Sequence, residues 1–242
     1  DDDDDNKATG NIVEVATSAN LSALLAAADK AGLADELADA AARLTVFAPT
    51  NAAFDTLATR LGLTDGAALV AALPAEALAS ILSYHVLPTR LNASALAAGG
   101  ATQATIYNFD GSAATLGVDG SSGVRLTDAV LTQATVTTAN VKATNGLVHV
   151  VDKVLVPPGV LNVVQMAQAN PAAFSSLVGA VVSANLAATL SGAGPFTVFA
   201  PTNTAFQAIA STVAGLSTSQ LATVLTYHVL ADEVLSSELG PV

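Results

Sequence analysis

The 242-residue sequence predicts an α+β fold that occurs twice in tandem. One seven-residue motif recurs without change, and such self-similarity indicates two copies of one unit. In the first copy, Ala- and Leu-rich segments with apolar residues at three-to-four spacing come first and predict helices. Segments in which Thr, Val and Ile alternate between turn dipeptides follow and predict strands. A mainly helical front half and a mainly strand-forming back half are typical of an α+β domain.

The predicted helices of the first copy lie at residues 21–37 and 66–82. Both segments are rich in Ala, and their apolar residues share one helix face. Pro74 interrupts the second segment and can begin a separate short helix there, because proline is tolerated in the first helical turn.

A strand is predicted between these two helical segments. Residues 45–48 are short and apolar, and Pro49 ends the run. Thr50 is expected to cap the helix that follows through Phe54 and Leu57, since a threonine hydroxyl can accept a hydrogen bond from the first helical turn.

Beyond residue 101 the pattern changes to strands. Three dipeptides separate them and are expected to supply the positive φ of tight turns: Asp110-Gly111, Asp119-Gly120 and Asn145-Gly146. Residues 147–156 are the clearest strand. The back half is therefore predicted to be mainly sheet.

Three segments of the first copy recur in the second in the same order. The motif Thr-Val-Phe-Ala-Pro-Thr-Asn at 45–51 is identical at 197–203, and Tyr-His-Val-Leu at 84–87 is identical at 227–230. Residues 11–16 align with 162–167. The first copy is expected to span residues 11–156, Pro157-Pro158-Gly159 a stiff joint, and the second copy residues 160–242.

The second copy is expected to be incomplete. Only 15 residues follow Tyr227, whereas 73 separate Tyr84 from Pro157, so the counterpart of the strand-forming back half is missing from the sequence given. The alternative is that the native polypeptide continues past Val242 and contains the missing strands. At the other end the sequence begins with Asp1 rather than Met, and a secretory signal is one of several segments that could precede it.

The formal net charge of −12 is unevenly distributed. Residues 1–5 are all Asp, and residues 1–10 are therefore expected to form a solvated acidic tail. All eight basic residues precede position 154, and the last 89 residues carry only Asp232, Glu233 and Glu238. This second part has little charge repulsion to oppose self-association.

Composition excludes several classes of function. The acidic balance disfavours nucleic acid, whose binding depends on clustered cations. The absence of cysteine excludes disulfides, thiolate nucleophiles and zinc ribbons. No run reaches the length of a membrane-spanning helix, since Pro74 and Glu76 interrupt the most apolar segment.

The repeated motifs together resemble the fasciclin (FAS1) domain. The resemblance rests on the helical front, the Thr-Val-Phe-Ala-Pro-Thr-Asn strand with Phe54 or Phe206 three residues on, the Tyr-His dipeptide, and the closing Asn-Gly…His-Val-Val-Asp-Lys-Val-Leu strand. It covers nearly all of the first copy and the first two motifs of the second. It implies a wedge in which helices flank a mixed β-sheet, and non-enzymatic proteins of the cell surface or matrix that need no cofactor.

The resemblance also bears on residues and anchoring. It links the Tyr-His region weakly with adhesion, which makes Tyr84, His85, Tyr227 and His228 candidate contact residues. In bacterial surface proteins of this kind an acidic spacer resembles the tether behind a lipid-anchored cysteine, so a lipid anchor upstream of Asp1 is a hypothesis.

The other chemistry-bearing residues favour structural roles. The alternative for His85 and His228 is a buried ring at a helix-to-strand junction, with its nitrogens bonded to backbone groups. His149 is expected on one sheet face, and three scattered histidines do not form a metal site. Two further sets carry no catalytic or cofactor motif and are expected to be turns or a solvated helix face: Gly120–Gly123 with Gly192–Gly194, and Asp35 with Glu36 and Asp39.

The resemblance thus implies an extracellular or cell-surface adhesion protein without enzymatic activity or cofactor. It is expected to bind proteins and to form homo-oligomers, with a strand from another subunit completing the second copy, head to tail, into a filament. One alternative is a carrier of a hydrophobic ligand such as a carotenoid or lipid, given the Ala-, Val- and Leu-rich composition. An enzyme with an unrecognised site is another.

Overall fold

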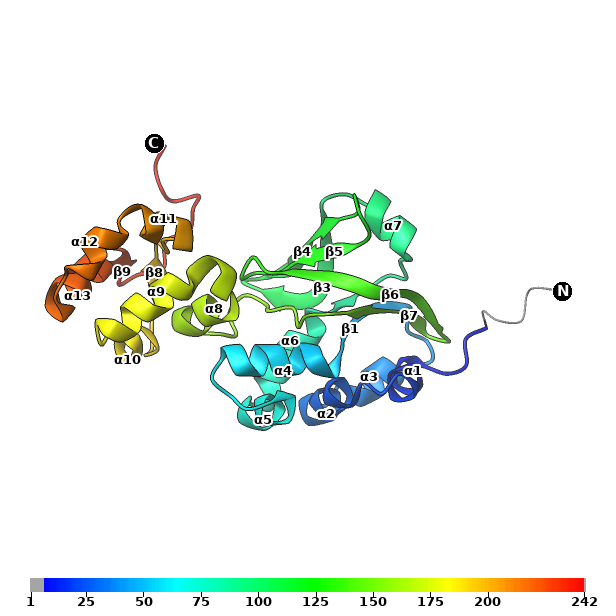
Figure 1. The fold of residues 1–242 in the computed structure, drawn as a ribbon. Coiled ribbons are helices and arrows are strands. Elements are labelled where there is room, and N and C mark those ends of the chain that lie inside the picture. Colours follow the sequence, from blue (N-terminus) through cyan, green and yellow to red (C-terminus); the bar gives the residue numbers. More distant parts are fainter. Residues whose placement is uncertain (1–6, 242) are drawn as a thin grey trace. The chain divides into compact units, whose positions relative to one another are not determined.

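The computed structural model describes residues 7–241, so the run of aspartates in the predicted acidic tail lies outside the described residues. The chain divides into two compact units between Val160 and Leu161. Unit 1 ends at Val160 and unit 2 begins at Leu161. Each unit is α+β, as predicted (Figure 1).

The described part of unit 1 contains seven helices: α1 (Ile12–Ser18), α2 (Ser22–Ala31), α3 (Ala34–Ala38), α4 (Asn51–Arg60), α5 (Gly66–Ala72), α6 (Ala75–Ser83) and α7 (Ala93–Ala98). The predicted helix over residues 21–37 is in fact two helices, because Gly32 takes a left-handed φ of 72° and ends α2. The predicted break at Pro74 is present: Pro74 is the N-cap residue of α6, which begins at Ala75. Thr50 caps α4 as predicted, with its hydroxyl accepting from the Ala53 N–H at 3.2 Å.

The sheet of unit 1 has seven strands: β1 (Leu44–Pro49), β2 (Val86–Leu87), β3 (Thr102–Phe109), β4 (Ser112–Asp119), β5 (Arg125–Thr127), β6 (Gln133–Ala143) and β7 (Gly146–Val151). Their order is β2-β1-β7-β6-β5-β4-β3, so β2 and β3 are the end strands. β1 runs parallel to β7 and antiparallel to β2, which makes the sheet mixed. Helices α1 to α6 gather on one side of it (Figure 1).

One of the three predicted turns has the expected backbone. Asp110 and Gly111 take φ values of 50° and 78° between β3 and β4. The prediction of positive φ is wrong for Asp119-Gly120, where a side chain on Gly120 would instead collide with Ala97. It is also wrong for Asn145-Gly146, where the Asn145 side chain forms hydrogen bonds with distant backbone groups instead.

Unit 2 contains six helices and two short strands in its described part: α8 (Val163–Ala169), α9 (Pro171–Ser183), α10 (Ala187–Leu190), β8 (Thr197–Val198), α11 (Asn203–Ala208), α12 (Ala210–Ala214), α13 (Thr218–Thr226) and β9 (Val229–Leu230). β8 and β9 are antiparallel and correspond to β1 and β2. Its hydrophobic core includes the buried side chains of Leu177, Val181, Leu221 and Leu225.

No single helix in residues 7–241 is long and apolar enough to span a membrane. α5 and α6 reach that length and composition only together, and they are bent by 118° at the break between them.

Candidate functional site

The Tyr-His motif of unit 1 lies in the interior, at the junction of α6 and β2. Tyr84 and His85 are each 1% exposed. The Tyr84 hydroxyl donates to the Thr115 carbonyl of β4 at 2.8 Å, and its ring meets Tyr107 edge to face. Burial raises the pKa of Tyr84 far above its ordinary value. Neither side chain of this motif presents surface to a partner.

His85 is held as a neutral ring by backbone groups. Its Nδ1 lies 2.7 Å from the Ile81 carbonyl, and its Nε2 accepts from the Leu155 N–H at 2.9 Å. Nδ1 therefore carries the proton. Burial lowers the pKa of His85 to about 4, which outweighs the opposite effect of the Ile81 carbonyl.

His149 on β7 is buried in the same way. Its Nδ1 accepts from the Asn140 N–H at 3.1 Å, its Nε2 lies 2.9 Å from the Leu91 carbonyl, and its ring stacks on Phe47. Burial lowers its pKa as well. No group of three or more His, Asp or Glu side chains is placed to hold a metal ion within residues 7–241.

Unit 2 repeats the hydrogen bonds that fix the front half of unit 1. Thr45 accepts from the Leu91 N–H and donates to the Thr89 carbonyl, and Thr197 accepts from the Val234 N–H and donates to the Asp232 carbonyl. The Phe47 N–H donates to the His85 carbonyl at 2.8 Å, and the Phe199 N–H to the His228 carbonyl at 2.9 Å. The local structure is therefore the same in both units.

The two units differ in what covers this local structure. Phe47, Tyr84 and Leu87 are buried in the core of unit 1, among side chains from residues 96–155. Their counterparts by the repeat are Phe199, Tyr227 and Leu230, which are 44%, 91% and 40% exposed. We call these three residues the open face of unit 2.

A strand position next to β8 is also unfilled. In unit 1, β1 pairs with β2 on one edge and with β7 on the other. β8 pairs with β9 alone in the described part of unit 2. His228 keeps the contact of Nδ1 with a carbonyl one turn back, Val224 at 2.8 Å, but no N–H in the described residues reaches its Nε2 as that of Leu155 reaches His85.

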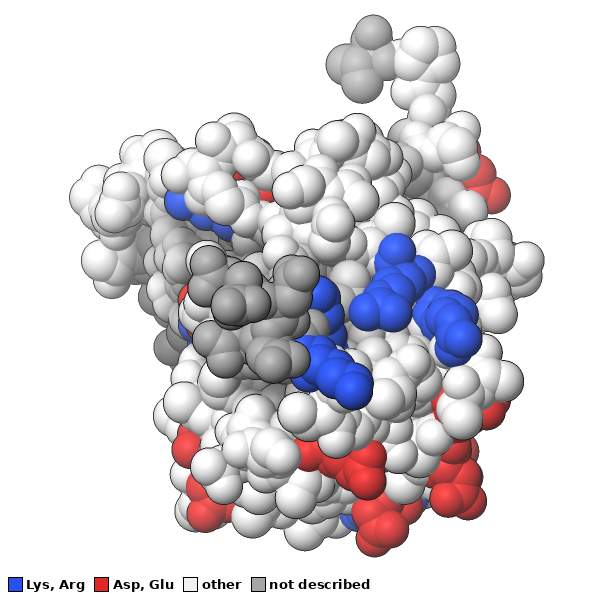
Figure 2. Space-filling model, turned by 90° about the vertical axis from the view of Figure 1, so that its right-hand side faces the viewer, with Lys and Arg blue, Asp and Glu red and all other residues white. Residues whose placement is uncertain are grey.

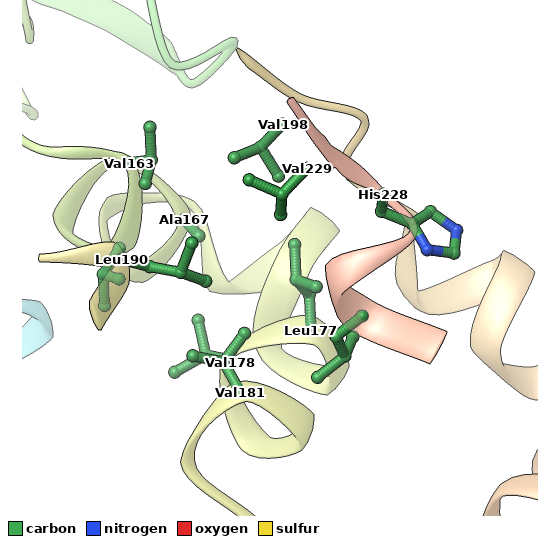
Figure 3. A pocket seen from close by; sticks show the side chains of 11 residues that line it. Val163, Ala167, Leu177, Val178, Val181, Leu190, Val198, His228 and Val229 are labelled. Carbon is green, nitrogen blue, oxygen red and sulfur yellow. The ribbon is translucent and has the colours of Figure 1, made fainter. Parts of the chain in front are cut away.

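An apolar groove lies on the other side of β8 and β9. Val198 and Val229 face the valines and leucines of α8 and α9, while the His228 ring points away from them (Figure 3). The cavity there measures about 30 Å³. This is room for a water molecule rather than for a ligand.

The surface of unit 2 carries few charges and most of the large exposed hydrophobic side chains. Eight of the ten large exposed hydrophobic side chains in the described residues belong to it. All Lys and Arg belong to unit 1. On the face drawn in Figure 2, basic side chains gather near the centre and most acidic side chains lie toward the lower edge. Large contiguous patches of exposed apolar side chains are typical of protein-contact sites.

Comparisons with known proteins agree with the repeat. The model of the Fasciclin domain family matches residues 19–157 and 172–241. The chain is 37% identical to protein sll1483 of Synechocystis sp. over 150 residues, covering 61% of this chain and 73% of that protein. It is 28% identical to human periostin over 201 residues, covering 81% of this chain and 21% of periostin.

A solved structure, a FAS1 domain pair from the insect cell adhesion molecule Fasciclin I, is 20% identical with a TM-score of 0.41. The match covers 94% of this chain and 75% of that one.

Proposed function

This chain belongs to the fasciclin domain family, and from that premise we propose that it is a non-enzymatic adhesion protein that acts through protein–protein contacts outside the cell or at its surface. The open face of unit 2 is the observation that carries the proposal, because Phe199, Tyr227 and Leu230 occupy positions that are buried in unit 1. The state of His85 and His149 supports a non-enzymatic role. Both ring nitrogens of each are engaged by backbone groups and are not free to transfer a proton to a substrate.

The finer proposal is that copies of the chain associate head to tail through this face. Within residues 7–241 one edge of β8 is unpaired, and an unpaired edge is a template for a further strand. A neighbouring copy holds its own β7 between β1 and β6, so the strand it offers comes from an end of its sheet. β3, with eight residues, is the longer of the two end strands. A contact between unlike surfaces that does not close on itself extends into a filament.

Low charge and the candidate contact residues fit the same surface. Unit 2 carries only Asp232, Glu233 and Glu238 as formal charges, so repulsion between copies is small. We retain Tyr227 and His228 as contact residues. Tyr84 and His85 act in such a contact only if unit 1 opens, because both are buried.

The test is the assembly state of the chain. We expect oligomers that grow with concentration in multi-angle light scattering, and a shift to monomers for the double variant Phe199→Ser/Tyr227→Ser. Leu131→Ser is the matched control, since Leu131 is 72% exposed on unit 1 and outside the open face. Monomers of the unaltered chain at every concentration would refute self-association, and an equal effect of the control would place the contact elsewhere.

A peptide experiment distinguishes strand addition from non-specific apolar association. In unit 1 the second edge of β1 is filled by Gly146–Val151. A synthetic peptide of residues 144–156 should therefore occupy the β8 edge and shorten the oligomers, whereas the same residues in scrambled order should not. Equal effects of the two peptides would show that strand pairing does not drive assembly.

The alternative function, a carrier of a carotenoid or lipid, is favoured by one observation. Unit 1 contains a cavity of about 450 Å³, within the range of small-molecule sites. Organic extraction of the protein from its native source tests this function, and a colourless extract free of lipid would exclude it.

A further inference from the structure

The cavity of unit 1 lies between its helices and the end of the sheet that carries β1 and β2. Its apolar wall comes from distant parts of the chain: Leu24 of α2, Leu37 of α3, Leu44 and Val46 of β1, Leu82 of α6 and Ile106 of β3. These side chains surround the volume on several sides, so an apolar molecule inside it loses most of its contact with water.

A second, smaller cavity adjoins the first. It measures about 210 Å³ and lies among α1, α2 and α3. Leu24, Leu37 and Val46 line both cavities, so these side chains form the partition between them. Movement of these three side chains would join the two cavities into one longer space that fits a long, narrow apolar chain.

α3 lies beside this partition, and the Asn145 side chain holds its C-terminal end. None of its five residues is buried. The Asn145 side-chain amide donates to the carbonyls of Leu37 and Asp39 at 2.9 Å each, and its oxygen accepts from the Ile12 N–H at 2.9 Å. The C-terminal end of α3 is thereby fixed to α1 and to the residue before β7, while Glu36 and Leu37 of the helix line the first cavity.

The charged residues of the lining are acidic. Glu36 and Asp39 reach it from α3 and its C-terminal end, and no Lys or Arg lines it. The other polar residues of the lining are Ser83 and His85, whose buried ring is neutral. Asp35, Glu36 and Asp39 are all exposed, as predicted for a solvated face, and the last two also line the cavity. Both carboxylates are exposed, so they stand at its mouth, where a cation is attracted and an anion repelled.

We propose that this cavity is a binding site for a small cationic amphiphile, with its single apolar chain between α2, α3 and β1 and its cationic head against Glu36 and Asp39. The proposal deepens the carrier alternative by naming the ligand class and its site. It is independent of adhesion, because none of the three open-face residues lines the cavity.

Calorimetric titration with dodecyltrimethylammonium, below the concentration at which it forms micelles, tests the proposal. The background variant Phe199→Ser/Tyr227→Ser removes binding to the open face. We expect saturable binding of one molecule per chain, and weaker binding of dodecyl sulfate, whose chain is the same and whose head is anionic. Equal affinities, or no saturable heat, would overturn the proposal.

Three substitutions locate the site. Glu36→Gln/Asp39→Asn should weaken binding of the cation about fivefold, the effect of losing two exposed charge pairs, without weakening binding of dodecyl sulfate. Asp35→Asn is the matched control, because Asp35 is exposed on the same helix but does not line the cavity. Because the control removes one charge and the double variant two, a loss of binding free energy half as large with the control would reduce the effect to net charge and contradict a site at the mouth.

Leu37→Trp should fill the cavity and abolish binding of both amphiphiles. If this variant fails to fold, which circular dichroism will show, the charge variants still decide the proposal. Light scattering on the parent chain reads self-association separately, so a failure of ligand binding leaves the adhesion proposal standing, and the reverse also holds.

Discussion

Acid is expected to destabilise unit 1 through His85. The ring is buried with its Nδ1 proton near the Ile81 carbonyl and its Nε2 accepting from Leu155, so a second proton on Nε2 would break the bond to Leu155 and place a charge in the core. Unfolding releases the ring into water, where it binds the proton at its ordinary pKa.

The magnitude follows from the two pKa values. The pKa of His85 is 6.5 in the unfolded chain and about 4 in the folded one. A lowered folded pKa contributes stability that is complete above 6.5 and is lost as the pH falls toward 4. At about pH 4.5 the free energy of unfolding is expected to be lower than at neutral pH by about 2 to 3 kcal/mol.

Two other buried groups modify this dependence. Burial lowers the pKa of His149, which adds to the loss in the same pH window. Burial raises the pKa of Asp128 despite the hydrogen bonds it accepts, and proton uptake by the folded state then offsets part of the loss as the pH falls. The difference between the parent chain and His85→Gln is therefore the quantity to measure.

Tyrosine fluorescence reports unit 1 selectively. The chain has no Trp and three Tyr. In a Tyr227→Phe background only Tyr84 and Tyr107 remain, and both belong to unit 1. Urea unfolding between about pH 7.5 and pH 4.5 should show the loss in this background, and His85→Gln should remove most of it while lowering stability at neutral pH. His228→Gln, the repeat counterpart, should keep the full dependence. A full dependence in His85→Gln would refute the reasoning.

Three further variants test the structure of unit 1 by urea or thermal unfolding. Asn145→Ala leaves one N–H and two carbonyls without their partner and should cost about 3 kcal/mol, so a loss well under about 1 kcal/mol would contradict the role given to this side chain. Tyr84→Phe loses its hydroxyl bond to β4 and should cost about 1 kcal/mol, while Tyr227→Phe should cost nothing measurable; similar losses would contradict the difference in burial. Gly146→Ala places a methyl group against the Leu44 carbonyl where β1 meets β7, and should lower the melting temperature by several degrees, so an unchanged value would argue against this strand pairing.

Local signals in the sequence predicted most of the fold. The Thr50 cap and the Asp110-Gly111 turn act within a few residues, and both are present. Gly32, inside the predicted helix 21–37, carried a signal for its break, because glycine commonly ends helices. The capping box of Asn11 and Glu14 marked α1, a helix that the sequence analysis did not predict.

The candidate site could be predicted only in part, because exposure depends on contacts far along the chain. Tyr84 and Tyr227 stand in identical four-residue motifs, yet one is 1% and the other 91% exposed. What separates them is residues 96–155, which cover the first; no described residue takes their place over the second. The cavity of unit 1 gave no sequence signal, since its wall combines residues as distant as Leu24 and Ile106.

The repeated hydrogen bonds of unit 2 bear on the order in which such a unit is made. The bonds around Thr197 and between Phe199 and His228 match those of unit 1, where all the bonded residues lie between Thr45 and Leu91. These bonds of the front half therefore need no partner from the later strands. A ribosome delivers this half first, so it can fold while the later strands are still being synthesised, and those strands then add to an existing template rather than to a disordered chain.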